Sequence, residues 1–306
     1  LARLHGTRHC MIFSTGFLAN LATISTLGGK DDTLLIDADC HASIYDACNL
    51  SSATIVRFRH NSPEDLDKRL SRMDEEQKGR TLIIVEGLYS MLGDVAPLKE
   101  LVDVKKKHGA SLMVDEAHSL GVFGETGCGL AQELGIMEEI DFIVGTFSKS
   151  VGTVGGYCVS NHPKFEMLRI AARPYDFTAS LPPSVVASAL TCVKILGSEP
   201  EHREKLWRNA RQLYSGLEKM GFDLGAECSP VIAVKIKSRE DAAHAWEKLF
   251  LGGVYANMAV SPATPQGLNL IRCSLSAAHT EEQIDKVLEV FETIANSNII
   301  NVKAAE

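Results

Sequence analysis

Several features that mark other protein classes are missing from this sequence of 306 residues. No apolar run approaches the roughly 20 residues that a helix needs to cross a bilayer. The amino terminus shows no basic segment followed by an apolar one. The net charge is −8 and no long basic run occurs, which argues against nucleic acid or an anionic membrane as the main partner. We therefore expect a soluble, cytoplasmic protein that holds any phosphate with local groups.

Three short motifs are also absent. The eight cysteines form no Cys-x-x-Cys pair and lie in apolar segments, which predicts reduced core thiols with neither a disulfide frame nor a metal site. No Gly-x-x-x-x-Gly-Lys occurs, so the chain has no P-loop. The first βα turn shows no Gly-x-Gly-x-x-Gly, which disfavours a nicotinamide-binding oxidoreductase.

Between Met11 and about Tyr157, short β-branched runs alternate with helical patterns. The alternation predicts an α/β fold with a mainly parallel sheet, helices on both faces, and ligands at the carboxyl ends of the strands. An apolar content of 45% is enough for a large core. The β-branched runs are TLLIDAD, ATIVRFRH, TLIIVEG, SLMVDEAHS, DFIVGTF and GGYCVS.

The later part of the chain has a different pattern. Pro182 and Pro183 should begin a helix, because proline fits the first turn of a helix and not its interior. Two long helical segments follow, and then strands alternate with helices. We expect a large α/β domain over residues 1–180 and a smaller α+β domain over residues 181–306.

Lys149 lies in DFIVGTFSKSVGTVGG, in a turn that follows an apolar strand. A lysine in such a turn is usually a solvated loop residue. In this turn, however, Gly152, Gly155 and Gly156 allow close backbone approach and several hydroxyl groups are at hand. The loop could cradle a phosphate while the amine meets a carbonyl group. The hydroxyl groups belong to Thr146, Ser148, Ser150 and Thr153.

A second group follows the strand in SLMVDEAHSLGVFG, where Asp115, Glu116 and His118 occur. An aspartate at the end of a strand is often only a helix cap or a turn residue. Two strands of one parallel sheet would nevertheless bring Asp115 and Lys149 to the same edge. A lysine for a Schiff base and an anion for a ring nitrogen suit pyridoxal 5′-phosphate, PLP.

Three other segments could complete such a site. His41 in DADCHASIYDA could start a helix or stack on a flat ring. Ser14, Thr15 and Gly16 precede an apolar helix whose start could bind an anion, although any capped helix looks the same. Arg272 in an apolar strand needs an anion, which could be a carboxylate of the protein or of a substrate.

Five motifs together resemble the α-oxoamine synthase family of fold-type I PLP-dependent enzymes, in order and over nearly the whole chain. Within that family, FSKSVGTVGGYCVSNHPKFE, FTASLPPSVV and PATP are most similar to bacterial members that use serine and palmitoyl-CoA. The five motifs are DADCHASIYDA, VDEAHSLGVFGETGCG, GTFSKSVGTVGG, RPYDFTASLPPS and SPATPQGLNLIRCSLSAAHT.

The resemblance implies a role for each matching residue. Lys149 would form the Schiff base, Asp115 would contact the pyridine nitrogen and His118 the phenolic oxygen. His41 would stack on the ring, and Arg272 would bind the carboxylate of serine. Thr178 would reach the phosphate in the neighbouring subunit, which implies a homodimer with shared sites. The phosphate contacts within one subunit would come from Thr15, Gly16, Phe17, Thr146 and Ser148.

The implied reaction is a decarboxylating condensation of L-serine with a long-chain acyl-CoA to a 3-ketosphinganine, the first step of sphingolipid biosynthesis. Condensation of glycine or alanine with another acyl thioester, delivered by CoA or by a carrier protein, stays open. A catalytically silent partner subunit is a further alternative, which the presence of Lys149, Asp115 and His41 disfavours.

Two departures from the family concern the start of the chain. The glycine-rich segment that usually precedes the HGT motif is absent from this sequence, so we expect part of the substrate entrance and of the dimer contact to lie outside it. Position 17 is Phe where several relatives have Tyr, which should not disturb a contact made through the backbone. We interpret the opening LARLHGTRHCMIFSTGF as a helix running into a loop.

Overall fold

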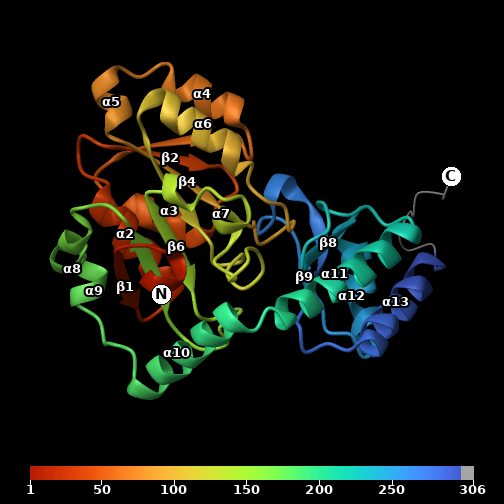
Figure 1. Cartoon of the computed structure of the whole chain (residues 1–306). Helices are drawn as coiled ribbons and strands as arrows, with labels where there is room; N and C mark the ends of the chain where they lie inside the picture. Colours follow the sequence, from red (N-terminus) through yellow and green to blue (C-terminus); the bar gives the residue numbers. More distant parts are fainter. Residues whose placement is uncertain (298–306) are drawn as a thin grey trace. The chain divides into compact units, whose positions relative to one another are not determined.

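The computed structural model describes residues 1–297, which fold into two compact units (Figure 1). This division differs from the expected boundary at residue 181, because helix α10 (Pro183–Ser198) belongs to the first unit. The reason is packing: Ala189 on α10 is buried in the core of the first unit. The first unit comprises Leu1–Tyr89 and Val95–Pro200, and the second comprises Ser90–Asp94 and the chain from Glu201.

The first unit is built on a seven-stranded sheet in the order β1-β7-β6-β5-β4-β2-β3. Strands β2 to β6 are parallel, and only β7 runs antiparallel to its neighbours β6 and β1. The predicted mainly parallel sheet is therefore confirmed. The strands are β1 (His9–Phe13), β2 (Thr33–Asp37), β3 (Thr54–Phe58), β4 (Thr81–Glu86), β5 (Ser111–Asp115), β6 (Phe142–Thr146) and β7 (Gly156–Ser160).

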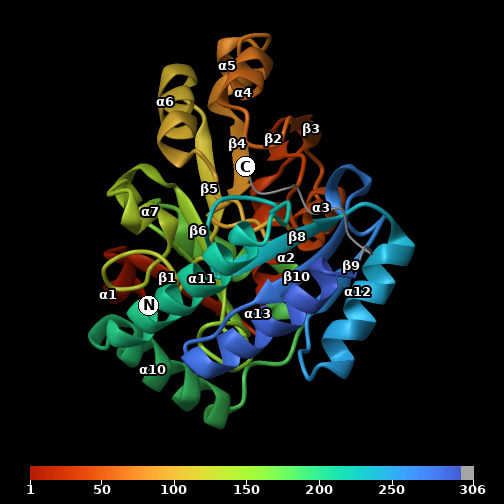
Figure 2. The same cartoon turned by 90° about the vertical axis from the view of Figure 1, so that its right-hand side faces the viewer.

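Helices cover both faces of this sheet, as predicted, and alternate strand residues enter two separate cores (Figure 2). In β5, Leu112 and Val114 face the core formed with α4, α6, α7 and α10. Met113 faces the other core, which α2, α3 and α8 complete. The helices are α1 (Ala2–His5), α2 (Gly16–Leu27), α3 (Ala42–Leu50), α4 (Pro63–Leu70), α5 (Glu75–Gly79), α6 (Leu98–His108), α7 (Leu130–Glu133), α8 (Leu168–Ala171) and α9 (Arg173–Asp176).

Strand β1 differs from the expectation of a helix running into a loop. The opening segment does form the short helix α1, but His9–Phe13 then pairs with β7 along its full length. Its extended conformation depends on that partner, since a strand is stabilised by cross-strand contacts more than by its own residues. Helix α10 begins at Pro183 as predicted from the paired prolines.

The second unit contains the three-stranded antiparallel sheet β8-β10-β9 and three long helices. Ile232, Val234 and Ile271 face these helices in one core. Arg272, adjacent to Ile271 in β10, points to the opposite face of the sheet. No helix within residues 1–297 is both long and apolar enough to cross a lipid bilayer. The elements are α11 (Glu201–Lys219), β8 (Val231–Ile236), α12 (Arg239–Leu251), β9 (Asn257–Ala259), β10 (Asn269–Ser274) and α13 (Glu281–Ala295).

Candidate active site

The polar residues at the carboxyl ends of β4, β5 and β6 share one face of the sheet. Glu86, Asp115 and Thr146 each follow, two residues later, a strand residue that lies in the core beneath α2 and α3. Because side chains alternate along a strand, all three point toward these two helices. Asp115 and Glu86 are also paired in register on neighbouring strands. Strand alternation thus gathers two carboxyl groups and a hydroxyl at one corner of the sheet.

Asp115 is buried, with 5% of its surface exposed, and both carboxylate oxygens accept hydrogen bonds. Its Oδ1 accepts from the backbone N–H of Ala117 at 2.9 Å. Its Oδ2 accepts from the side-chain amide of Asn20 at 2.7 Å. A buried carboxylate that accepts two hydrogen bonds is held in one orientation.

His41 is the N-cap of α3, and its ring Nδ1 accepts the backbone N–H of Ser43. Its own backbone N–H donates to the carboxyl group of Glu86 at 2.5 Å. Burial lowers the pKa of His41, although the nearby charge of Asp115 acts in the opposite direction. The expected helix start and the expected place in the site are therefore both found, because the cap itself lies at the pocket.

Glu86 is fully enclosed beside Asp115. Burial raises the pKa of Glu86 well above its ordinary value, and the neighbouring charge of Asp115 raises it further. The hydrogen bond from His41 and the charge of Lys149 act against this, but burial is the larger effect. Glu86 is thus a carboxyl group whose burial disfavours its charged form, an arrangement that often marks functional sites.

The start of α2 packs tightly against the end of β6. A Cβ atom on Gly16 would lie 2.7 Å from the Cβ of Thr146, so only glycine fits there. Thr15 caps the helix by accepting the backbone N–H of Leu18 at 3.0 Å. The Thr146 hydroxyl contacts that of Ser148 at 2.9 Å. A helix start and two hydroxyl groups therefore converge as an anion site would require.

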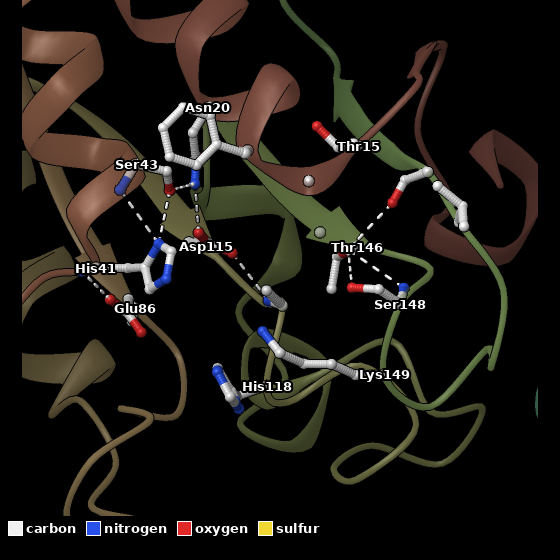
Figure 3. A pocket seen from close by; sticks show the side chains of 16 residues that line it. Thr15, Asn20, His41, Ser43, Glu86, Asp115, His118, Thr146, Ser148 and Lys149 are labelled. Atoms are coloured by element: carbon white, nitrogen blue, oxygen red, sulfur yellow. Dashed lines mark hydrogen bonds between the residues drawn. The ribbon is translucent and has the colours of Figure 1, made fainter. Parts of the chain in front are cut away.

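Lys149 and Asp115 line one cavity of about 290 Å³ at this corner (Figure 3). Lys149 lies in the exposed loop after β6 and extends into the cavity, where its charge reaches His41 and Glu86. The cavity lining includes nine of the predicted site residues: Thr15, Gly16, Phe17, His41, Asp115, His118, Thr146, Ser148 and Lys149.

Glu116, directly after Asp115, fixes the loop that follows. Its buried carboxyl group accepts the backbone N–H groups of Leu130 and Ala131 at 3.0 and 2.9 Å, and the hydroxyl of Ser119. These bonds join the strand end to the start of α7, and burial still raises the pKa of Glu116. Glu116 therefore supports the segment that carries Asp115 and His118 without lining the cavity itself.

Two predicted residues are not among those that line the cavity. Thr178 lies in the exposed segment between α9 and α10. Arg272 lies in the second unit, where its Nε donates to the backbone oxygen of Ser90 at 2.5 Å and its Nη1 to the hydroxyl of Ser274 at 2.8 Å. Burial lowers the pKa of Arg272, and within residues 1–297 it forms no ion pair with an acid. The roles of Thr178 and Arg272 stay predictions.

Three polar residues of the cavity escaped the sequence analysis: Asn20, Ser43 and Glu86. Asn20 is an amide in an otherwise apolar helix segment, one turn after Gly16. Glu86 ends an apolar strand in TLIIVEG just as Asp115 ends its own strand, so the same argument could have found it. Ser43 has no distinctive signal, because serine is common in the first turn of any helix.

Comparison with known proteins places this chain in a family. The family described as Aminotransferase class I and II matches residues 1–291. Serine palmitoyltransferase of Sphingomonas paucimobilis is 57% identical over 294 residues, which cover 95% of this chain and 70% of that protein. A putative 8-amino-7-oxononanoate synthase of Halalkalibacterium halodurans is 41% identical, over 96% of this chain and 74% of that protein.

A solved structure agrees with the sequence comparison. A variant of the Sphingomonas paucimobilis serine palmitoyltransferase with bound PLP–myriocin aldimine is similar with a TM-score of 0.94 and 56% identity. The match covers 96% of this chain and 74% of that one. The predicted fold type and its family are thereby confirmed. This chain belongs to the aminotransferase class I and II family.

Proposed function

We propose that the chain is a PLP-dependent acyltransferase that condenses L-serine with a long-chain acyl-CoA, palmitoyl-CoA, and releases carbon dioxide and CoA. The product would be 3-ketosphinganine, and the activity that of a serine palmitoyltransferase. The observation that carries the proposal is that Lys149 and Asp115 line one cavity in a chain 57% identical to a protein of that name. A cytoplasmic location, expected from the sequence, stays a prediction.

The residues of the cavity fit PLP. Gly16 and Thr146 approach so closely that any side chain at position 16 would fill the cradle, which leaves backbone N–H groups and hydroxyls for a phosphate. Asp115 is held by two donors at the opposite end, where a ring nitrogen needs an anion. When bound, PLP supplies a ring that withdraws electrons from the Cα of an amino acid.

Each residue then has a physical task. Lys149 would bond the aldehyde of the cofactor and, once displaced by serine, its amine would take the proton from Cα. Asp115 would keep the ring nitrogen protonated, because a close anion favours the cationic form. His41 would pack on the ring plane, and His118 would hydrogen-bond its phenolic oxygen.

Arg272 and Thr178 extend the proposal beyond the residues that line the cavity. Arg272 would bind the carboxylate of serine, which fits a guanidinium group that within residues 1–297 has only a carbonyl and a hydroxyl as partners. Thr178 would contact the phosphate in a second copy of the chain, so that a homodimer shares its sites. Its exposure in this chain supports that assignment.

The decisive experiment is incubation of the PLP-loaded chain with serine and palmitoyl-CoA, with mass detection of the aminoketone and assay of released CoA. Both products are expected in equal amounts. A chain that binds PLP but forms neither product with any amino acid would refute the activity. A chain that stays colourless with added PLP would favour the silent partner subunit.

The shared site can be tested by mixing two inactive variants. Lys149→Ala and Thr178→Ala should each be impaired alone. If Thr178 acts in the neighbouring site, a mixed dimer contains one site with both native residues, and activity should return on subunit exchange. If the activity of the mixture does not exceed the summed activities of the two variants, Thr178 does not act in the neighbouring site.

A second candidate activity is condensation of glycine or alanine with another acyl thioester. The 41% identical relative named as a putative 8-amino-7-oxononanoate synthase favours it, since that name denotes a different pair of substrates. An amino-acid screen that follows the absorbance of bound PLP would separate the two. A spectral response and CoA release with glycine or alanine but not serine would overturn the choice of substrate.

A further inference from the structure

A continuous chain of hydrogen bonds joins His41 to Asp115 (Figure 3). The Nδ1 of His41 lies 2.8 Å from the hydroxyl of Ser43. That hydroxyl lies 2.9 Å from the side-chain nitrogen of Asn20, and the same nitrogen lies 2.7 Å from Oδ2 of Asp115. Asn20 and Ser43 therefore link two residues that the proposed function assigns to opposite sides of one ligand ring.

The charge of Asp115 decides how the amide of Asn20 is turned. An amide presents either two N–H donors or a carbonyl oxygen to a neighbour. An oxygen at 2.7 Å from the carboxylate would repel it, so the NH₂ group must face Asp115. The second N–H of the same group then points to Ser43. With both donors engaged, the orientation of Asn20 is fixed.

The direction of the Ser43 hydroxyl follows from this. Its oxygen accepts from Asn20, so its own hydrogen is available for Nδ1 of His41. The backbone N–H of Ser43 also points at this nitrogen, at 3.2 Å. A ring nitrogen that receives two donors cannot carry a proton itself. The proton of a neutral His41 must therefore lie on Nε2.

Because Asn20 and Ser43 are buried, water cannot easily take the place of their hydrogen-bond partners. Asn20 and Ser43 are 3% and 1% exposed. Within residues 1–297, no hydrogen bond occupies Nε2 of His41, so this is the ring nitrogen left for a ligand. The proton position on His41 thus depends on Asp115 through Asn20 and Ser43, two buried side chains that have few alternative hydrogen-bond partners.

We propose that Asn20 and Ser43 are positioning residues that hold His41 as its neutral Nε2–H tautomer. In the proposed function, on which this consequence rests, His41 presents a hydrogen-bond donor at the cavity. The donor would meet an oxygen of the substrate while the ring face packs on the cofactor. The hydrogen bond that Asp115 accepts from Asn20 sets the direction of the whole linkage.

The tautomer can be measured directly by NMR. The full chain is labelled with ¹⁵N-histidine, and the His41 signals are identified by their loss in His41→Gln. The ¹⁵N shifts of Nδ1 and Nε2 are recorded between pH 5 and 8, before and after PLP is added. We expect one bare and one protonated nitrogen throughout the neutral range. The charged and titratable groups that act on His41 are Asp115, Lys149, Asp46 and Glu86.

Two variants and a control test the linkage. Ser43→Ala removes a donor to Nδ1, and should raise the pKa of His41 by about 0.5 to 1 pH unit and reveal some Nδ1–H tautomer. Asn20→Leu removes the amide that donates to the Ser43 oxygen and leaves the Ser43 hydroxyl free to turn, so it should mix the tautomers as well. Ser25→Ala removes a hydroxyl from the same helix as Asn20, where it bonds only the backbone of Leu21, and should change neither signal.

The outcomes separate this inference from the proposed function. An Nδ1–H tautomer or a charged ring at pH 7 in the unaltered chain would overturn the inference, whatever the variants do. So would His41 signals in Ser43→Ala that match those of Ser25→Ala. If the chain fails to bind PLP or to turn over serine, the proposed function falls, while the tautomer measured without PLP still decides the role of Asn20 and Ser43.

Discussion

The two units of the chain treat carboxyl groups in opposite ways. In the first unit, Asp37, Glu86 and Asp115 end three neighbouring strands and are all at most 5% exposed. In the second unit, no Asp or Glu from residue 201 to 297 is buried. The second core consists of aliphatic, aromatic and sulfur-containing side chains packed between a sheet and its helices.

This contrast shows where the molecule tolerates an energetic cost. Burying an ionisable group is unfavourable unless hydrogen bonds or a shifted pKa compensate. Asp115 is compensated by two donors and Glu86 by a raised pKa. Such groups are expected where chemistry requires them, while a unit that only packs and positions can omit them.

The largest effect should follow from Lys149→Ala. Without the amine no covalent bond to PLP can form, so the characteristic absorbance should be lost and turnover should fall on the order of 1,000-fold or more. Lys219→Ala, an exposed lysine in the last turn of α11, is the control from the second unit and should behave like the unaltered chain. Wild-type rates in Lys149→Ala would refute the assigned role.

The next largest effect should come from Asp115→Asn, which keeps the shape of the side chain and removes its charge. We expect kcat/KM to fall about 100-fold, because a preorganised charge at the site is lost. Asp141→Asn is the matched control: Asp141 precedes β6 at the other edge of the sheet, where it accepts from Leu112 at 2.7 Å. It should lose stability without losing the response to serine. Similar losses of kcat/KM in Asp115→Asn and Asp141→Asn would show that the charge of Asp115 has no special role in the reaction.

Much of the first unit could be predicted from the sequence because parallel strands have a strong signal. Apolar runs ending in Asp115 and Thr146 gave both the sheet and the edge where the site lies. The antiparallel direction of β7 could not be predicted, since composition does not encode strand direction. Strand β1 was missed because its structure depends on pairing with β7.

The site, like the sheet, could be predicted from the sequence only in part. Asp115 and Thr146 at strand ends were found, whereas Asn20 and Ser43 within helices were not, because a polar residue in a helical pattern resembles a cap or a solvated position. Asn20 and Ser43 acquire their meaning only when α2 and α3 are packed beside Asp115. The contacts of Arg272 with Ser90 and Ser274 likewise join distant or unremarkable positions, so only the three-dimensional structure reveals them.

The buried carboxyl group of Glu86 should make the free energy of unfolding depend on pH. The folded pKa of Glu86 lies well above its ordinary value of 4.5. As pH rises above 4.5 the unfolded chain releases this proton and the folded chain keeps it, so the folded state loses stability. Relative to Glu86→Gln, which cannot titrate, the unaltered chain should lose about 1.4 kcal/mol of unfolding free energy per pH unit.

Urea denaturation of both proteins between pH 5 and 8 measures this difference. The two free energies of unfolding should diverge steadily in favour of Glu86→Gln until the folded pKa is reached. Activity should change only a few-fold, because glutamine still accepts the backbone N–H of His41. A difference that stays constant over this range would mean that Glu86 is ionised in the folded chain.

The smallest expected effect comes from a comparison of two threonine helix caps, one in each unit. Thr15 caps α2 at the cavity, and Thr280 caps α13 in the second unit, each by accepting a backbone N–H with its hydroxyl. Replacing either with alanine should lower the free energy of unfolding by about 1 kcal/mol. Only Thr15→Ala should also weaken PLP binding, by about 5- to 10-fold in Kd, because the phosphate would lose a hydroxyl at the helix start. Equal PLP affinities for the two variants, measured by equilibrium dialysis, would show that the Thr15 hydroxyl does not contact the phosphate.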